Sequence, residues 1–292
     1  MDMISLKAKA KVNLSLDVTG IRADGYHEMR MINHSIDLED VLTFEANDEG
    51  IILTSNDHSI PLDERNLVMK VALKLQQKFN IKQGVEIHLE KRIPAQAGLA
   101  GGSSDAAATL KGLNTIWKLN LSRPELLAIG VTIGADVPYC LVGGTALVEG
   151  IGEKITPLKG LKSMPVLVVK PDINIATPWA FEKLDKQTIE KHPDINGLIR
   201  LLEANDYTGL KDTIGNVFEA VAFATYPEIA EIKKEMLAQG AMASIMTGSG
   251  STVIGYYSDQ EMAEQSYRRF KETYAMCFIT KTMDNGGENY VG

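Results

Sequence analysis

The segment that most restricts how this chain can fold is a run of small residues that joins an alternating strand to a helical pattern. Residues 85–90 alternate between apolar and polar side chains, which predicts a half-buried strand. The next segment, PAQAGLAGGSSDAA at residues 94–107, consists mostly of glycine, alanine and serine. From Ser104 to Trp117 the apolar residues fall on one face of a helix. The predicted order is therefore strand, glycine-rich loop and helix.

The composition of this loop suits a bound triphosphate. Glycine permits positive φ angles, and small side chains let the backbone approach a ligand closely. The N–H groups of the loop and of the helix N-terminus then form a concave surface with partial positive charge. Ser103 and Ser104 would add hydroxyl ligands to phosphate oxygens or to magnesium. The lysine of the Walker pattern is absent, and a tight connection that binds nothing is the alternative interpretation.

The rest of the chain mixes strands and helices in no regular alternation. Residues 12–18 alternate as in a half-buried strand and lead to the turn signal Asp24-Gly25. Asn66 is expected to cap a helix over residues 68–79. Further strands are expected at 42–45, 51–54, 164–170 and 276–280, further helices at 124–133, from Pro227 and after Ser258, and a loop followed by a strand after Gly134. This irregular order favours an α+β fold over a doubly wound sheet.

Length, charge and cysteine content exclude several classes of protein. The chain has 292 residues, enough for two moderate domains, and a net charge of −8 without any block rich in lysine or arginine. We therefore expect no nucleic-acid partner. No apolar run approaches the length of about 18 residues that a membrane span needs, and no signal peptide is recognisable. Cys140 and Cys277 lack the spacing of a zinc site or a disulfide framework, so we expect buried thiols, no membrane partner and a cytoplasmic location.

Taken singly, the other candidate residues have ordinary explanations. Asp136 lies in the segment GADVP, where an aspartate commonly caps a helix or fixes a turn. Lys11 would usually be a solvated lysine. Tyr26 and His27 would close a hairpin, and Phe181 would be a core aromatic residue.

Three segments together resemble the motifs of the GHMP kinases, and they span nearly the whole chain. They are AKAKVNLSLDV at the N-terminus, PAQAGLAGGSSDAA, and MTGSGSTVIGYY at residues 246–257. They are similar to the family's lysine-bearing strand, its P-x3-G-L-[GA]-[GS]-[GS]-S-[SA] loop and its C-terminal glycine-rich turn. The stretches RADGYH and GADVPY resemble the branch of the family that phosphorylates a cytidine-diphosphate-linked polyol. A kinase of the mevalonate or homoserine type, and a non-catalytic nucleotide-binding homologue, are the alternatives.

The resemblance implies a fold and an activity. The fold would be the two-domain GHMP kinase fold, with a ribosomal protein S5 domain 2-like domain at residues 1–155 and a ferredoxin-like domain at 156–292. The active site would lie in the cleft between them. The activity would be ATP-dependent phosphorylation of the polyol's 2-hydroxyl group, with Mg²⁺ as the counter-ion of ATP and no dedicated metal site on the protein. The protein would be a monomer or a homodimer.

The resemblance also implies roles for particular residues. Asp136 would take the proton of the acceptor hydroxyl, and Lys11 would lie beside it and orient it. Asn13, Tyr26, His27 and Phe181 would bind the substrate, with Phe181 stacking on the cytosine. ATP would be bound by Asn66 and by the loop residues Pro94, Ala95, Gln96, Ala97, Gly98, Leu99, Ala100, Gly101, Gly102, Ser103 and Ser104. The loop departs from the family pattern at Ala100 and Asp105, where many members have glycine and asparagine.

Overall fold

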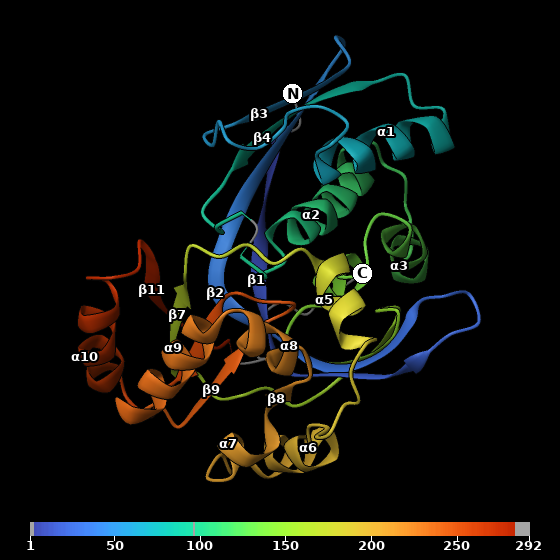
Figure 1. Cartoon of the computed structure of the whole chain (residues 1–292). Coiled ribbons are helices and arrows are strands. Elements are labelled where there is room, and N and C mark those ends of the chain that lie inside the picture. Colours follow the sequence, from blue (N-terminus) through green and yellow to red (C-terminus); the bar gives the residue numbers. More distant parts are fainter. Residues whose placement is uncertain (1–2, 96, 284–292) are drawn as a thin grey trace.

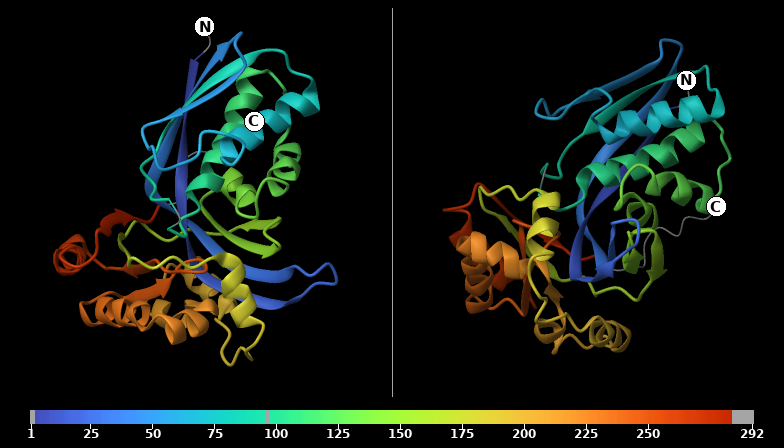
Figure 2. Two further views of the ribbon diagram at one scale, coloured as in Figure 1. Left: turned by 45° about the horizontal axis from the view of Figure 1, so that its top comes forward. Right: turned by 45° about the vertical axis from the view of Figure 1, so that its right-hand side comes forward.

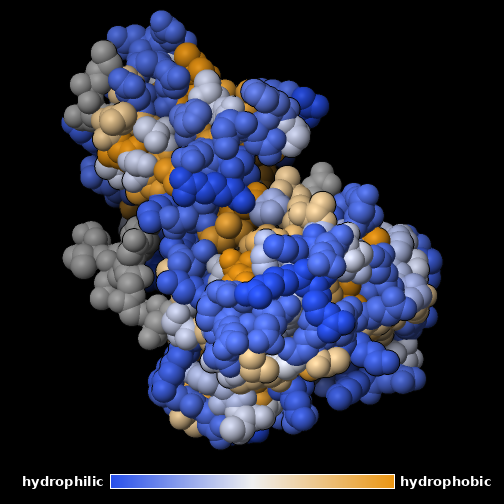
Figure 3. All heavy atoms as spheres, turned by 90° about the vertical axis from the view of Figure 1, so that its left-hand side faces the viewer, coloured by the Kyte–Doolittle hydropathy of each residue, from blue (hydrophilic) through white to orange (hydrophobic). Residues whose placement is uncertain are grey.

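Two β-sheets organise the part of the chain that the computed structural model describes, residues 3–95 and 97–283. They lie in two lobes that meet at a waist (Figure 1). A space-filling view shows a largely hydrophilic surface on which apolar side chains gather in the hollow between the lobes (Figure 3). Gln96, expected in the phosphate-binding loop, lies outside the described residues.

The first sheet is built on one long antiparallel hairpin. Its strands are β1 (Met3–Ile21) and β2 (His27–Asn47), joined at the predicted turn. The sheet order is β3-β4-β2-β1-β8; in addition, β5 pairs with β2, and β6 pairs with β5. The bounds of the other strands are β3 (Ile51–Ser55), β4 (Gly84–Glu90), β5 (Thr145–Gly150), β6 (Lys154–Pro157) and β8 (Gly215–Asn216). The β1–β2 register shifts between Lys9 and Lys11 and again between Asn13 and Ser15. Such irregularities re-aim side chains, and these two lie on either side of Lys11 and Asn13.

The helices of the first lobe lie on one face of this sheet (Figure 2). They are α1 (Leu67–Phe79), α2 (Gly101–Ile116), α3 (Arg123–Val131) and α4 (Val137–Val142). The predicted cap of α1 is confirmed, because the Asn66 side chain accepts the Val68 N–H at 2.9 Å. The buried apolar residues of α1 and α2 pack with those of β2 and β4 in one core.

The second sheet is antiparallel, with the order β11-β7-β10-β9. Its strands are β7 (Pro165–Lys170), β9 (Ala243–Met246), β10 (Val253–Tyr256) and β11 (Met276–Lys281). The helices of this part of the chain are α5 (Thr177–Leu184), α6 (Ile195–Ala204), α7 (Leu210–Thr213), α8 (Phe218–Thr225), α9 (Pro227–Ala238) and α10 (Gln260–Phe270). The two sheets with their helices confirm the expected α+β class.

Three local expectations were wrong. The segment expected as a loop after Gly134 contains α4, because Val137, Tyr139 and Leu141 are buried and stabilise a short helix there. Helix α2 begins at Gly101 rather than Ser104. Helix α10 is capped by Asp259, whose carboxylate accepts the Met262 N–H at 2.9 Å, and not by Ser258.

The boundary predicted between residues 155 and 156 falls inside β6 and stays a prediction. Contacts cross it, since β8 pairs in parallel with β1 and two of the three apolar cores contain residues from both sides. Among the described residues, no helix combines the length and apolarity required to cross a membrane.

Candidate active site

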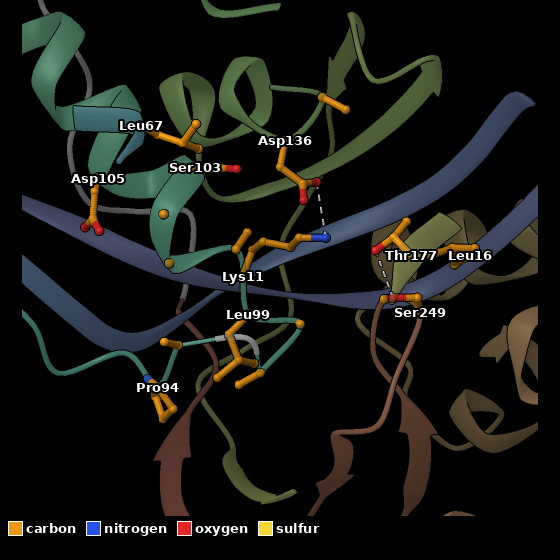
Figure 4. Close-up of a pocket in the computed structure, with 18 of the residues that line it drawn as sticks. Lys11, Leu16, Leu67, Pro94, Leu99, Ser103, Asp105, Asp136, Thr177 and Ser249 are labelled. Atoms are coloured by element: carbon orange, nitrogen blue, oxygen red, sulfur yellow. Dashed lines mark hydrogen bonds and ion pairs between the residues drawn. The ribbon is translucent and has the colours of Figure 1, made fainter. Parts of the chain in front are cut away.

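A cavity of about 800 Å³ lies between the lobes and is lined by both. The close-up shows Leu67, Pro94 and Asp105 at one end, and Leu16, Thr177 and Ser249 at the other (Figure 4). Lys11 and Asp136 lie between these two groups. The cavity is therefore elongated, with the predicted acid–base pair near its middle.

The glycine-rich loop forms one wall of the cavity, and its small residues are required by its geometry. Gly98 has φ +70°, and a Cβ there would lie 3.2 Å from the backbone oxygen of Thr247. Ala100 adopts the left-handed conformation, with φ 56°, immediately before α2. The Leu99 carbonyl accepts the Lys11 backbone N–H at 3.0 Å, so the loop is fixed to β1 beside the candidate lysine.

The start of α2 places backbone N–H groups at the cavity wall, ahead of the helical hydrogen-bond ladder. The helical hydrogen-bond ladder begins with Ser104 N donating to the Ala100 carbonyl at 2.9 Å. The N–H groups of Gly101, Gly102 and Ser103 precede that ladder and have no partner within the helix. All three residues line the cavity. Together with the positive end of the helix dipole they form a site suited to phosphate oxygens.

The two serines of the loop have different environments. Ser103 lines the cavity, and its side chain lies on the same side of Lys11 as Asp136 (Figure 4). Ser104 is buried and donates its hydroxyl to the Lys9 carbonyl at 2.7 Å. The structure therefore brings only Ser103 of this pair to the cavity, while Ser104 fastens the helix to β1. The other predicted loop residues that the structure describes, Pro94, Ala95, Ala97, Gly98, Leu99, Ala100, Gly101 and Gly102, all line it.

Lys11 and Asp136 form an ion pair at the cavity wall. The Lys11 Nζ lies 3.3 Å from Asp136 Oδ1, and the side chains are 5% and 33% exposed respectively. Asp136 occupies the position before α4, yet its side chain makes no capping hydrogen bond. The side chain of Asp136 therefore does not cap the helix, which is a common role of an aspartate at this position. Asp136 lines the cavity, and its carboxylate lies beside the Lys11 ammonium.

Asn13 lies behind Lys11, not on the cavity wall. It is fully buried, and its amide oxygen accepts the Lys11 Nζ at 3.3 Å. Its Nδ2 donates to Asn33 Oδ1 at 2.6 Å. The direct substrate contact expected of Asn13 has no geometric support here, because its side chain is engaged by protein groups.

The end of the cavity beyond α2 is lined by Ile60, Pro61, Asn66 and Leu67. The Asn66 amide oxygen caps α1, and its Nδ2 donates to the Pro61 carbonyl at 2.9 Å. Asn66 therefore borders the predicted adenosine site while its side chain holds the surrounding loop. The apolar side chains at this end offer a surface for a flat ring.

A buried charge cluster, which sequence reasoning did not find, supports this end of the cavity. The Lys91 ammonium contacts Asp40 and lies 2.9 Å from Asp105 Oδ2. Burial raises the pKa of Asp105 to about 8, against the lowering effect of Lys91, and Asp40 adds to the rise. The two carboxylates outweigh burial at Lys91 and raise its pKa. Asp105 lines the cavity, but its carboxylate is paired with the Lys91 ammonium inside the protein.

Aromatic residues form the opposite end of the cavity. The His27 ring stacks on Phe181 with centroids 4.2 Å apart and 25° between the planes. The His27 Nε2 lies 2.8 Å from Asp185 Oδ1, and the Phe181 and Phe218 rings are perpendicular with centroids 4.9 Å apart. Tyr26 also lines the cavity and is 61% exposed. Tyr26 and His27 of the β1–β2 hairpin and Phe181 of α5 thus line the same end of the cavity, while their predicted binding of the substrate stays a prediction.

Comparisons with known proteins agree with this geometry. Two family models match, described as the GHMP kinases N terminal domain at residues 66–144 and the GHMP kinases C terminal at residues 178–275. A protein of Clostridium tetani named 4-diphosphocytidyl-2-C-methyl-D-erythritol kinase is 48% identical over 280 residues, covering 96% of this chain and 100% of the relative.

Solved structures of related kinases have the same fold. A crystal structure of 4-(cytidine 5'-diphospho)-2C-methyl-D-erythritol kinase superposes with a TM-score of 0.81 at 30% identity, covering 96% of this chain and 99% of the other. Homoserine kinase from Cytophaga hutchinsonii follows with a TM-score of 0.77 at 21% identity, covering 97% and 95%. With both family models matched in order and a near-full-length relative at 48% identity, the chain belongs to the GHMP kinases.

Proposed function

We propose that this kinase transfers the γ-phosphate of ATP to the 2-hydroxyl of 4-diphosphocytidyl-2-C-methyl-D-erythritol, a step of the non-mevalonate route to isoprenoid precursors. The observation that carries the proposal is the Lys11–Asp136 pair at the middle of one cavity, with helix N–H donors toward one end and an aromatic wall at the other. Such a site suits two nucleotide-containing ligands that meet at the pair. The named relative at 48% identity supports the choice of acceptor.

Asp136 and Lys11 have distinct tasks in this proposal. The acceptor oxygen attacks the γ-phosphorus, the bond to the leaving ADP oxygen breaks, and the hydroxyl proton passes to the Asp136 carboxylate. Lys11 holds that carboxylate in place and offers positive charge to the oxygens that become more negative. Positioning and charge stabilisation supply most of the rate in phosphoryl transfer, so both groups need a fixed geometry.

The loop and the aromatic wall bind the two ligands. The N–H groups of Gly101, Gly102 and Ser103 would hold phosphate oxygens, and the apolar residues beyond α2 would hold the adenine ring. His27, Phe181 and Tyr26 would hold the cytidine of the acceptor. In the described structure His27 already stacks on Phe181, so the cytosine would stack on the outer face of this pair or displace one ring.

Magnesium would enter with ATP and neutralise phosphate charge. Within residues 3–95 and 97–283, no group of three or more His, Cys, Asp or Glu side chains is arranged to hold a metal ion. Ser103 and Asp136 line the cavity and would offer oxygen ligands to such an ion. These donors fit a cation shared with a triphosphate better than one held by the protein alone.

The test is transfer of radiolabelled γ-phosphate from ATP to purified 4-diphosphocytidyl-2-C-methyl-D-erythritol, with mevalonate and homoserine as competing acceptors. We expect labelling of the cytidylated polyol. Asp136→Asn should lower kcat by about 10²–10⁴-fold, because the general base is removed while ATP can still bind. Lys11→Ala should also lower kcat strongly.

A matched control is Lys281→Ala, which breaks an exposed ion pair with Asp37 away from the cavity and should leave kcat unchanged. Preferential labelling of mevalonate or homoserine would reject the proposed acceptor. Wild-type turnover by Asp136→Asn would remove that residue from the mechanism. ATP binding without transfer to any acceptor would indicate a non-catalytic homologue.

A further inference from the structure

We infer that Thr247, in the turn between β9 and β10, is a positioning residue that sets the Lys11 ammonium through Asn13. Thr247 is fully buried and does not line the cavity, so it cannot act by touching a substrate. This inference rests on the proposed role of Lys11. It assigns to the C-terminal lobe a part in arranging a lysine that belongs to the N-terminal strand.

The contacts run through the side chain of Asn13. Its amide oxygen accepts three donors, which are Lys11 Nζ at 3.3 Å, Thr247 Oγ1 at 3.2 Å and Gly248 N at 2.9 Å. The Thr247 hydroxyl oxygen in turn accepts the Asn13 backbone N–H at 3.1 Å. Thr247 is therefore bound to both the backbone and the side chain of Asn13. The amide of Asn13 has no freedom to rotate away from Lys11 without breaking these bonds.

The strand alone cannot fix this geometry. The β1–β2 register is irregular on both sides of Lys11 and Asn13, so regular pairing does not determine where their side chains point. A lysine side chain has four flexible carbon bonds and loses considerable rotamer freedom when its ammonium is held in one position. Among the described residues, Asp136 and Asn13 act as the acceptors that hold it there. The third N–H of the ammonium remains to point toward a ligand in the cavity.

The same turn also holds the glycine-rich loop. The Thr252 hydroxyl donates to the Ala97 carbonyl at 2.6 Å, and the turn closes through Thr247 N donating to the Thr252 carbonyl at 2.9 Å. The turn thus fixes the loop and, through Thr247, the lysine. A displacement of the turn relative to β1 would therefore move the glycine-rich loop and the Lys11 ammonium together.

The test compares Thr247→Val with Thr247→Ser. Valine keeps the branched shape and loses the hydroxyl, whereas serine keeps the hydroxyl. The matched control is Thr282→Val, because Thr282 is also fully buried and its hydroxyl likewise donates one bond, to the Lys162 carbonyl at 2.7 Å, and accepts one, from Met164 N at 2.9 Å. Thr282 does not line the cavity. Loss of stability alone should therefore be similar in the two valine variants.

We expect Thr247→Val to lower kcat by about 10- to 100-fold, with a smaller effect on the KM for ATP, because the reacting geometry is loosened while the loop remains. Thr247→Ser should keep kcat within about twofold, and Thr282→Val should keep wild-type kcat despite a lower denaturation midpoint. If Thr247→Val does not fold, Thr247→Ala against Thr247→Ser makes the same comparison.

Equal kcat in Thr247→Val and Thr282→Val would overturn the inference, and so would equal losses in Thr247→Val and Thr247→Ser. Lys11→Ala, measured in the same assay, separates this failure from failure of the proposed function. If Lys11→Ala is inactive while Thr247→Val is unaffected, only the positioning role is lost. If Lys11→Ala remains active, the role proposed for the lysine is itself wrong.

Discussion

Asp105 shows how one buried residue can make stability depend on pH. It lies with Asp40 against the single Lys91 ammonium, and its Oδ1 has no hydrogen-bond partner among the described residues. Burial raises its pKa to about 8. The folded protein therefore keeps a proton that the unfolded chain releases near pH 4. Above that pH the contribution of Asp105 to the stability of the native state falls continuously until the folded carboxyl also ionises.

Asp105→Asn should remove this dependence. Relative to the wild type, the variant should gain stability as pH rises from about 4 to about 8, by at most roughly 1.4 kcal/mol per pH unit. Urea denaturation at pH 5 and at pH 8 measures the gain. Asp212→Asn, in an exposed helical turn, serves as the control and should show no such trend. A variant less stable than the wild type by the same amount at both pH values would mean that Asp105 is ionised throughout.

The site residues were accessible from the sequence to different degrees. Lys11, Asp136 and the aromatic residues were predicted from their resemblance to family motifs, since a lysine in a strand and an aspartate in a turn have ordinary explanations. The Lys91 cluster was missed because it joins residues 40, 91 and 105, whose proximity depends on how β2, β4 and α2 pack. The inward orientation of Ser104 and Asn13 was missed for the same reason. Their partners are distant in sequence.

At the scale of elements, α2 joins the ligand site to the core of the first lobe. Its N-terminus lines the cavity, while Gly112 in its middle lies against the Phe44 ring of β2. A Cβ at Gly112 would come within 2.6 Å of that ring. Glycine is normally unfavourable inside a helix, so its presence here reflects close helix–sheet packing.

Gly112→Ala should therefore destabilise the protein even though alanine is the better helix former. Alanine gains about 1 kcal/mol in helix propensity, but overpacking a core costs about 1–3 kcal/mol, so the expected net loss of stability is up to about 2 kcal/mol. The control is Gly102→Ala in the same helix, where a Cβ would meet only Leu67 Cδ1 at 3.8 Å. That variant should be as stable as the wild type or slightly more so. Chemical denaturation measures the stability of both variants. Wild-type stability of Gly112→Ala would show that the Phe44 ring moves aside without cost.

Elements with a clear period were predicted well, and those fixed by tertiary packing were not. Alternation indicated the middle of β1 and all of β4, and apolar spacing with a capping asparagine indicated α1. The full length of β1 and β2 was not apparent, because both strands contain register shifts and stretches buried on both faces. Helix α4 was missed because its six residues are too few to display a period.

At the scale of the whole molecule, the two lobes share their apolar interior. Leu16, Val18 and Met31 of the first sheet belong to the same core as Phe218 and Val253 of the second lobe. A second core joins residues of β1 to residues of α6 and β10 in the same way. The turn that holds Asn13 and Ala97 adds polar contacts across the boundary. Neither lobe buries all of its apolar surface by itself.

The shared cores predict a single cooperative unfolding transition rather than one for each lobe. Leu110 lies in the core that is confined to the first lobe, and Leu198 lies in a core that both lobes share; both leucines are fully buried. The test variants are Leu110→Ala and Leu198→Ala. Each truncation should cost about 2–5 kcal/mol and move the same calorimetric transition to lower temperature. ATP should raise the temperature of the whole transition, because it binds the folded state alone. Two resolved transitions, with Leu110→Ala moving only one of them, would show instead that the lobes unfold independently and that their shared interior contributes little to stability.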